Sequence, residues 1–396
     1  MLCQRIFLGL IFSFFWIFPL WAEKLAVSVD SEAAILINAE NGAILYEKNA
    51  HTPHYPASIT KIATTAYALK EKSDHLSKPV TAEQEAIASI SEEAKKRSNY
   101  TTPSHWVELA STHMGIKKGE VFTLKDLLFG VMVVSANDAA NVVAQYVGGT
   151  IPNFIVGLDS YIKGLGCKDT HFTNPHGLHH PKHVTTPYDM AIITREAMKN
   201  STFRELASTV KFIRPKTNKQ GSLVILQKNR LLRSGKYYYP KAIGVKTGYT
   251  SIARHTLVAA AKQGDRELIA VLMKGNEAGQ VYQDAIQLFD AAFNQVKLQK
   301  IILKAGPQKI TYNLEGAEKP LKTYIKDHLA FSYYPAEEPV VKCYVQWLPI
   351  KLPLAKDQQV GEILLKTSQG HLLQKTPLYI EEEVQETWMQ WIKDIF

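Results

Sequence analysis

Strand-like segments lie at both ends of a long stretch whose middle is helical in pattern, and this order is what most constrains the fold. Near the N-terminus, apolar runs at Ala33 to Ile37 and Ala43 to Lys48 flank Asn41-Gly42. This dipeptide favours a tight hairpin because both residues tolerate positive φ. Three more β-favouring runs come late in the stretch, at Ile243 to Lys246, Thr256 to Ala261 and Glu267 to Leu272. Strands grouped at the two ends predict an α+β fold, an antiparallel sheet flanked by helices.

The segments between these strand groups carry helical periodicity. Apolar residues recur at helical spacing from Ile59 to Leu69, and Thr123 to Tyr146 has the composition of one mostly buried helix. Helical pieces continue between Ile151 and Met198, and Val281 to Phe293 predicts a last helix. Residues 71 to 120 are polar and give no clear assignment.

The length of 396 residues favours two folded units over one. After about residue 297, short β-favouring runs punctuated by proline and glycine replace the helical pattern, which is typical of a small β domain. We therefore expect one domain over residues 23 to 296 and a β-rich domain over residues 297 to 380.

The first 22 residues have the pattern of a secretory leader. Arg5 precedes an apolar run that ends at Trp21 and Ala22, and polar residues follow. The run is short for a membrane span, and Pro19 interrupts it, although an uncleaved anchor is the alternative. Such a leader would direct export of the chain. Its cleavage after Ala22 would lower the net charge from +9 to +8.

A basic chain of this kind suits an anionic polymer or membrane surface. The sequence has no basic run interleaved with aromatic residues, so we expect no nucleic-acid partner. Cys167 and Cys343 fall in different predicted domains, which favours unpaired thiols over a disulfide.

Residues 381 to 396 predict an amphipathic helix. From Val384 onward, Trp388, Trp391, Ile392 and Ile395 share one face, and Glu386, Gln390 and Lys393 lie opposite. Two tryptophans on a short terminal helix favour a position in a membrane interface. The alternative is a helix whose apolar face caps the β domain.

The chemistry is carried first by Ser58-Ile-Thr-Lys61. A spacing of three places both side chains on one helical face, where a neutral lysine can take the proton that makes serine a nucleophile. The motif alone is weak, since Ser160 to Lys163 and Ser208 to Lys211 also match it.

Two later motifs single out Ser58. Ser135-Ala-Asn137 ends an apolar run, and Lys246-Thr-Gly248 follows a predicted strand. Of the three Ser-x-x-Lys matches, only the one at Ser58 precedes both. This ordered triple is typical of penicillin-binding proteins and β-lactamases.

The surrounding segments resemble the D-alanyl-D-alanine carboxypeptidases, the low-molecular-mass penicillin-binding proteins. The resemblance covers roughly residues 25 to 295 and continues weakly into the β domain. It is carried by Tyr55-Pro-Ala-Ser-Ile-Thr-Lys61, Val134-Ser-Ala-Asn-Asp-Ala-Ala140, Asn174-Pro-His-Gly-Leu178 and Gly244-Val-Lys-Thr-Gly-Tyr-Thr250.

The resemblance implies a reaction and its partners. The substrates would be peptidoglycan stem peptides ending in D-Ala-D-Ala, β-lactams would act as inhibitors, and no cofactor or metal would be needed. The enzyme would work at the periplasmic face of the cytoplasmic membrane, held peripherally by its C-terminal helix.

The resemblance also implies roles for individual residues. Ser58 would attack the carbonyl between the two D-alanines, Lys61 would accept its proton, and Ser135 would relay protons. The backbone N–H groups of Ser58 and Tyr249 would form the oxyanion hole. The residues expected to bind the substrate are Asn137, Lys246, Thr247, Gly248 and Tyr249.

The sequence departs from the family where an arginine is expected before an aromatic-x-Asp-Ala segment, since Val281 stands there. Lys274, Thr247 and Arg254 are the candidates to bind the substrate carboxylate in its place. Residues 84 to 112 also form a longer connection than the family has, without an assigned role.

Five histidines fall within 13 residues, which raises the question of a metal site. A helix is disfavoured here by Pro175, Gly177 and Pro181, so the histidines cannot share a helical face. We therefore expect a loop beside the catalytic site. The histidines are His171, His176, His179, His180 and His183.

Two other functions remain open from the sequence. A β-lactamase would use the same nucleophile, but no Glu-x-x-Leu-Asn segment for class A deacylation lies between Asn137 and Lys246. A non-catalytic cell-wall or β-lactam binding protein would keep the fold. The complete set of motif residues favours an enzyme over a binding protein.

Overall fold

The computed structural model of the chain describes residues 12–14 and 24–389. Its described residues divide into two compact units. One runs from Lys24 to Asn294, and the other begins at Gln295 and includes residues 12–14. Each unit is described by itself below.

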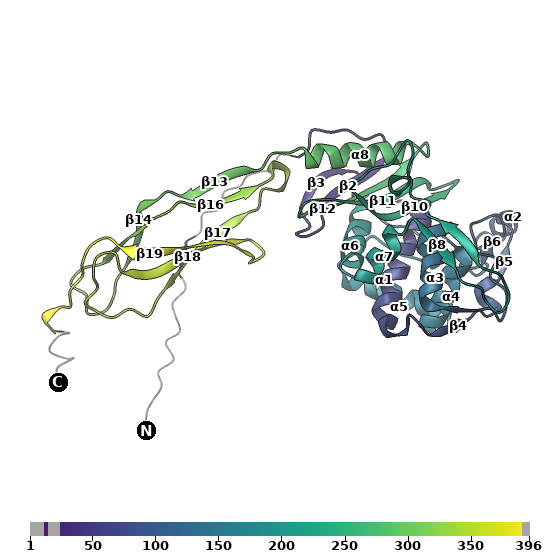
Figure 1. Cartoon of the computed structure of the whole chain (residues 1–396), viewed down its shortest axis with the longest axis horizontal. Helices are drawn as coiled ribbons and strands as arrows, with labels where there is room; N and C mark the ends of the chain where they lie inside the picture. The colour runs from purple at the N-terminus through teal and green to yellow at the C-terminus, as the bar shows by residue number, and fades with distance from the viewer. Residues whose placement is uncertain (1–11, 15–23, 390–396) are drawn as a thin grey trace, which may run out of the picture. The chain divides into compact units, whose positions relative to one another are not determined.

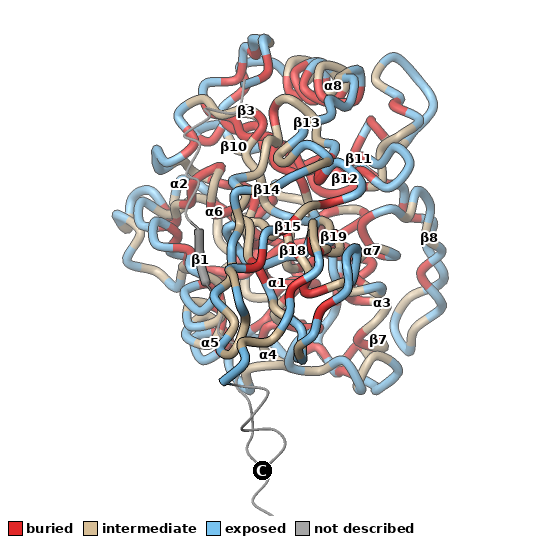
Figure 2. The backbone as a smooth tube through the Cα atoms, turned by 90° about the vertical axis from the view of Figure 1, so that its left-hand side faces the viewer, coloured by how far each residue is buried: buried red, intermediate tan, exposed pale blue. Residues whose placement is uncertain are grey.

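The first unit is built on a five-stranded antiparallel sheet in the order β10-β11-β12-β2-β3. Strands from both ends of the unit meet where β12 pairs with β2, and Leu268 lies opposite Asn38. The central strands are almost wholly buried, and Figure 2 shows the buried segments running through them. The bounds are β2 Ala33–Asn38, β3 Ile44–Lys48, β10 Ala242–Thr250, β11 Arg254–Gln263 and β12 Arg266–Gly275.

Helices cover both faces of this sheet (Figure 1). Helix α8, Gln280–Phe293, lies on one face, and α1, α6 and α7 lie on the other. The buried core contains residues from α1, α3, α4, α5 and α6 together with the sheet. The bounds are α1 Thr60–Lys72, α3 Leu124–Phe129, α4 Asn137–Gly148, α5 Ile151–Gly164, α6 Pro187–Ala197 and α7 Ser201–Ser208.

The prediction of one helix from Thr123 to Tyr146 is wrong. Helix α3 passes into a π-helical turn, Gly130–Val134, and the chain then leaves helical geometry before α4 begins at Asn137. Ser135 has φ of 71° and ψ of 37°, and Ala136 is extended. An isolated left-handed residue of this kind is uncommon and marks a special position.

The segment that the sequence left unassigned contains several short elements. They are β4 Pro79–Thr81, β5 Ser89–Ile90, α2 Glu92–Arg97 and β6 Val107–Glu108, and β7 Val121–Thr123 follows directly after the segment. A hairpin of β8, Lys211–Arg214, and β9, Leu223–Leu226, was not predicted either. Elements this short carry too few residues to show a period.

The second unit is β-rich. A sheet in the order β1-β17-β18-β19-β15-β14 accompanies the pair β13-β16. Leu365, Leu378 and Phe331 belong to one core cluster and Leu354 and Val360 to a second. The bounds are β1 Phe12–Phe14, β13 Leu298–Leu303, β14 Gly306–Tyr312, β15 Leu321–Ile325, β16 Leu329–Tyr333, β17 Val341–Trp347, β18 Gln359–Thr367 and β19 Leu372–Ile380.

Strand β1 lies within the expected leader and pairs with β17, with Phe12 opposite Val345. The other leader residues fall outside the described ones. Removal of the leader would leave β17 as an edge strand of this sheet.

At the C-terminal end, the structure differs from the expected start of the helix. Val384 is fully buried and forms a β-bridge with Leu354, and Glu386 forms one with Ala317. Helical geometry begins at Trp388, and the expected helical residues beyond Met389 lie outside the described residues. Within residues 12–14 and 24–389, no helix combines the length and apolar character that crossing a membrane requires.

Candidate active site

The serine that the sequence singles out lies at the start of α1. Ser58 is the middle residue of a short 3₁₀ helix, Ala57–Ile59, which leads directly into α1. Ala57 adopts φ of 50°, which turns the chain sharply just before Ser58. Ser58 remains half-buried, whereas Lys61, one turn later, is fully buried. The Lys61 Nζ atom lies 3.1 Å from Ser58 Oγ.

The Lys61 amine has two further close neighbours, and both are carbonyl oxygens. Its Nζ atom donates to Asn137 Oδ1 at 2.6 Å and to the backbone oxygen of His176 at 2.6 Å. Carbonyl oxygens only accept, so these two contacts use two N–H groups of the amine. A neutral amine then has its lone pair left for the Ser58 hydroxyl.

The surroundings of Lys61 favour this neutral form. Burial lowers the pKa of Lys61 well below its usual value, and the cations Lys246 and Lys228 lower it further. Asp138 raises the Lys61 pKa but is the smallest of these influences. A desolvated ammonium beside two other positive charges loses its proton readily.

Ser135 and Asn137 reach the site because the helical run breaks between them. The left-handed backbone of Ser135 ends the π-helical turn, and its side chain is buried at the cavity that contains Ser58. Asn137, the first residue of α4, donates through Nδ2 to Ser111 Oγ at 2.9 Å. The same amide thus contacts Lys61 on one side and Ser111 on the other.

Strand β10 is an edge strand of the sheet, and it carries the remaining motif to Ser58. Lys246 is buried, and burial followed by the charge of Lys228 lowers its pKa to about 7. At Gly248, a Cβ atom would lie 2.8 Å from the Ser58 backbone nitrogen and 2.5 Å from Thr256 Oγ1. Glycine is required there for the strand to approach the backbone of Ser58 so closely.

The loop that supplies the His176 carbonyl is also held by a glycine. Gly177 has φ of +88°, and a Cβ atom there would lie 1.9 Å from the Ala57 oxygen. Thr64 Oγ1 donates to the oxygen of Pro175, and Gly177 N–H donates to Asn174 Oδ1 at 2.7 Å. These contacts fix the loop against α1.

Two histidines of this loop are hydrogen-bonded to neighbouring parts of the protein. The His176 ring contacts the His105 oxygen and the Leu178 N–H, and the His183 ring contacts Thr60 Oγ1 at 2.9 Å. Burial lowers the pKa of both rings well below the usual value. Among the described residues, no group of histidine, cysteine and acidic side chains is arranged to hold a metal ion. The two described cysteines, Cys167 and Cys343, are free.

One cavity of about 540 Å³ joins most of the predicted site residues. Lys61 and Lys246 do not line this cavity but contact residues that do. Lys61 is hydrogen-bonded to Asn137, and Lys246 Nζ donates to the Thr247 oxygen at 3.0 Å. The predicted residues that line the cavity are Ser58, Ser135, Asn137, Thr247, Gly248 and Tyr249.

The other two Ser-x-x-Lys matches do not form such a site. Ser160 Oγ donates to the Val156 oxygen within α5, and Ser208 Oγ donates to the Arg204 oxygen at the end of α7. Lys163 forms an ion pair with Asp159 on the surface of α5. Both serines therefore make ordinary helical contacts.

The structure distinguishes between the three residues predicted as candidates for binding the substrate carboxylate. Thr247 lines the cavity, but neither Lys274 nor Arg254 does. Lys274 forms an ion pair with Glu32 at 2.8 Å.

Several residues that line or support the cavity were missed by the sequence reasoning. Ser111 comes from the long connection at residues 84 to 112, and Lys228 and Arg230 follow the unpredicted hairpin. Lys228 Nζ donates to Thr112 Oγ1 at 2.8 Å. In the sequence, only the position of Ser111 in an unusually long connection could have pointed to it. No motif contains Lys228 or Arg230.

The chain matches known proteins over most of the first unit. The model of the D-alanyl-D-alanine carboxypeptidase family matches residues 21–277. The carboxypeptidase DacF of Bacillus subtilis is 27% identical over 360 residues, 90% of this chain and 86% of the relative. DacB2 of Mycobacterium tuberculosis is 33% identical over 264 residues, 65% of this chain and 81% of the relative.

Solved structures of penicillin-binding proteins and DD-transpeptidases are also similar to this chain. Penicillin-binding protein 5 of Haemophilus influenzae aligns with a TM-score of 0.61 and 25% identity, covering 91% of this chain and 99% of that one. The Streptomyces K15 DD-transpeptidase aligns with a TM-score of 0.58 and 27% identity, covering 67% and 99%. The matched family model spans the Ser58, Ser135 and Lys246 motifs. The chain belongs to the D-alanyl-D-alanine carboxypeptidase family.

Proposed function

We propose that this chain is a serine-type D-alanyl-D-alanine carboxypeptidase that removes the terminal D-alanine from peptidoglycan stem peptides through an acyl-enzyme on Ser58. The observation that carries the proposal is the set of contacts around Lys61. A buried amine with a lowered pKa donates to two carbonyl oxygens and lies 3.1 Å from a serine hydroxyl. This is the geometry of a general base beside its nucleophile.

In the acylation step, Lys61 takes the Ser58 proton as Oγ attacks the carbonyl between the two D-alanines. As the C–N bond breaks, the proton taken up by Lys61 passes through the Ser135 hydroxyl to the departing amine of D-alanine, and Lys61 is neutral again. Oxygen charge develops where the Ser58 and Tyr249 N–H groups would stabilise it. The close approach of Gly248 to the Ser58 nitrogen supports this pair of donors.

In the deacylation step, water attacks the ester on Ser58, and the same base, Lys61, accepts the proton of that water. The ester C–O bond then breaks, and the proton passes from Lys61 to Ser58 Oγ, which restores the free enzyme. Asn137 holds the Lys61 amine in place through its 2.6 Å contact and would orient the bound peptide. Lys246 and Thr247 would bind the substrate from β10. β-Lactams would acylate Ser58 by the same attack and act as inhibitors.

We further propose that the chain is exported and works peripherally on the membrane. The leader at residues 1–22 supports export, and the exposed Trp388 and Met389 support a terminal helix that lies in the membrane interface. An enzyme of the cell wall would then work next to its polymeric substrate.

The test combines a fluorescent penicillin with an assay of D-alanine release from a D-Ala-D-Ala pentapeptide. We expect stable labelling of the wild-type protein, D-alanine release, and loss of both in Ser58→Ala. Rapid turnover of the drug would instead show a β-lactamase. Absence of both labelling and release in the wild type would show a non-catalytic binding protein and end the proposal.

A further inference from the structure

The proposed substrate ends in a carboxylate, and the inference below rests on that proposed function. An enzyme that acts only at the last peptide bond has to recognise this charge close to the bond that it breaks. A buried or partly enclosed carboxylate needs a cationic partner, and arginine offers two parallel donors for it. The question is which side chain supplies them here.

The cavity at Ser58 is strongly cationic. Lys228, Arg230 and Arg233 all line it, and none of its lining residues is acidic. This composition suits the anionic end of a ligand.

A second cavity, of about 410 Å³, adjoins the first and is lined by charges of both signs. Ser111 and Tyr249 line both cavities. The second is also lined by three glutamates and by Lys95 and Lys96, which form ion pairs with Glu108 and Glu92. The Ser58 cavity, whose charged lining residues are all cationic, is therefore the better place for the free carboxylate, and the rest of the peptide can extend toward the second.

Two of the three cations at the Ser58 cavity are already engaged. Lys228 donates to Thr112 Oγ1 and lies close enough to Lys61 and Lys246 to lower their pKa values. Arg233 donates through Nη1 to the Gln227 oxygen at 3.1 Å. Each of these contacts uses one N–H donor of its side chain and holds that side chain toward the protein.

Arg230 is the cation that remains available. Its guanidinium lies over the Tyr237 ring, 5.9 Å from the centroid, and it forms no ion pair with any residue in the described part of the chain. Two other residues that line the cavity wall, His255 and Tyr282, are near this charge. Burial lowers the pKa of His255 and raises that of Tyr282, and the positive charge of Arg230 acts to lower both. Val281, on the same wall, carries no charge.

We infer that Arg230 binds the C-terminal carboxylate of the substrate and so selects peptides that end in a free D-alanine. Arg230 follows the β8–β9 hairpin, in the short 3₁₀ helix Arg230–Leu232. The guanidinium lies over the Tyr237 ring and can donate two N–H groups to the carboxylate without losing an acidic partner in the described chain.

The experiment compares two peptides that differ only at the terminus, one ending in D-Ala-D-Ala and the other in D-Ala-D-Ala-amide. We expect Arg230→Ala to lower kcat/KM for the free acid about ten- to hundred-fold and to leave kcat/KM for the amide within about two-fold. Arg230→Lys should give an intermediate loss on the acid, because a point charge replaces the fork.

The matched control is Lys236→Ala. Lys236 also lies over the Tyr237 ring, at 5.3 Å, but does not line the cavity, so both peptides should react as with the wild type. Equal losses on acid and amide in Arg230→Ala, or no loss on either, would overturn the assignment. A wild type that neither releases D-alanine nor reacts with penicillin would instead overturn the proposed function, so the two failures are distinguishable.

Discussion

At the scale of single residues, the site depends on three lysines held close together. Lys61 and Lys246 are buried, and Lys228 stands at the exposed rim, where surrounding protein atoms still lower its own pKa by desolvation. A positive charge on one lysine lowers the pKa of a neighbouring lysine. The cluster therefore favours one neutral amine, at Lys61, while Lys246 stays close to its titration point at neutral pH.

Lys61→Arg tests the base directly. Arginine keeps a positive charge but cannot lose a proton near neutrality, so acylation by fluorescent penicillin should fall by about 10²–10⁴-fold. Lys163→Arg, in the Ser-x-x-Lys match on α5, should label like the wild type. Near-normal labelling of a folded Lys61→Arg protein, checked by circular dichroism, would show that another group takes the proton.

The pH dependence of acylation follows from the same lysines. The rate should rise with pH as Lys61 loses its proton, and fall as Lys246 becomes neutral around its pKa of about 7. Because Lys228 lowers the pKa of Lys246, Lys228→Met should move the falling limb to higher pH.

Stopped-flow acylation by a chromogenic cephalosporin across pH 5 to about 10 would measure both limbs. The exposed Lys216 offers a control, since Lys216→Met should leave the profile in place. A falling limb that stays fixed in Lys228→Met would mean that Lys246 does not set it.

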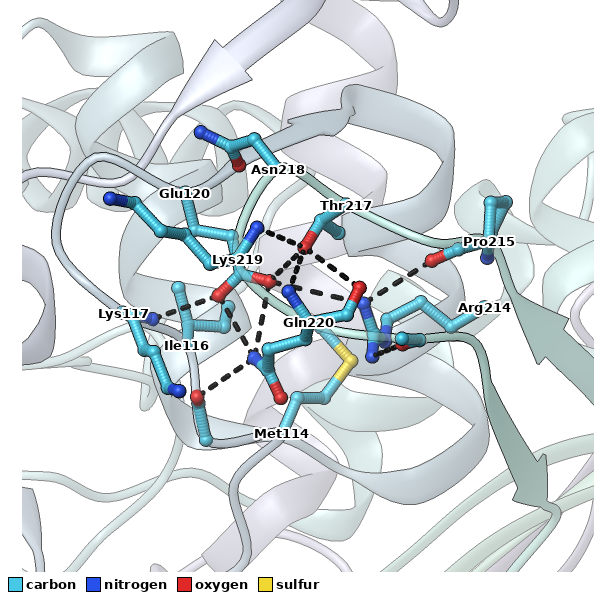
Figure 3. A network of polar contacts seen from close by, with 12 residues as sticks. Met114, Ile116, Lys117, Glu120, Arg214, Pro215, Thr217, Asn218, Lys219 and Gln220 are labelled. Atoms are coloured by element: carbon cyan, nitrogen blue, oxygen red, sulfur yellow. Dashed lines mark hydrogen bonds and ion pairs between the residues drawn. The ribbon is translucent and has the colours of Figure 1, made fainter.

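At the scale of elements, the β8–β9 hairpin is held by a buried polar network (Figure 3). Glu120 is fully buried and accepts from the Lys117 N–H at 3.0 Å and from Gln220 Nε2 at 2.9 Å. Arg214 lies 3.9 Å from the same carboxylate and is also buried. The network ties the loop before β7 to the turn of the hairpin, and the hairpin leads on to Lys228 and Arg230.

Glu120→Gln should lower the free energy of unfolding by about 2–3 kcal/mol, because Arg214 would remain buried without its counter-charge. Chemical denaturation measures this loss. The double variant Glu120→Gln/Arg214→Met should recover part of the stability, since the orphaned charge is gone.

The surface pair Lys125–Glu205, at 2.9 Å, is the control for that experiment. Glu205→Gln should change the free energy of unfolding by less than about 1 kcal/mol. If Glu120→Gln has an effect no larger than Glu205→Gln, the buried network does not stabilise the hairpin.

At the scale of the whole molecule, the chain has two units with separate cores. The first contains the whole candidate active site, and the second is a β-rich unit that leads to the proposed terminal helix. Val384 belongs to a core cluster of the second unit, so the segment up to Thr387 is part of that unit rather than of an independent anchor.

Deleting Trp388 to Phe396 should therefore release the mature protein from membranes without unfolding it. Fractionation of cells or binding to lipid vesicles measures the release, and penicillin labelling of the soluble variant checks that the active site is intact. Val384→Asp, by contrast, should destabilise the second unit while leaving the terminal tryptophans present. An unchanged membrane fraction after the deletion would remove the helix as the anchor.

The strands of the five-stranded sheet and most of the helices in the first unit could be predicted because each has a local cause. Alternating or continuous apolar runs marked β2, β3, β10, β11 and β12, and Asn41-Gly42 marked the first turn. The break at Ser135 could not be predicted, because Leu, Val and Met before it and Ala and Val after it fit an unbroken buried helix. The contacts around Ser135 and Asn137 appear only when α4 packs against α1 and the loop at residues 110 to 112.

By itself, the sequence determined the order of the motifs and the chemical groups available for catalysis, because these depend on residue type and spacing alone. The tertiary structure decided what could not follow from spacing. It brought the His176 carbonyl and Asn137 to the Lys61 amine, placed three cations around one cavity, and left Arg230 without an acidic partner in the described chain. Charge and desolvation act through space, so residues far apart in the sequence set the pKa of a lysine only after the chain has folded.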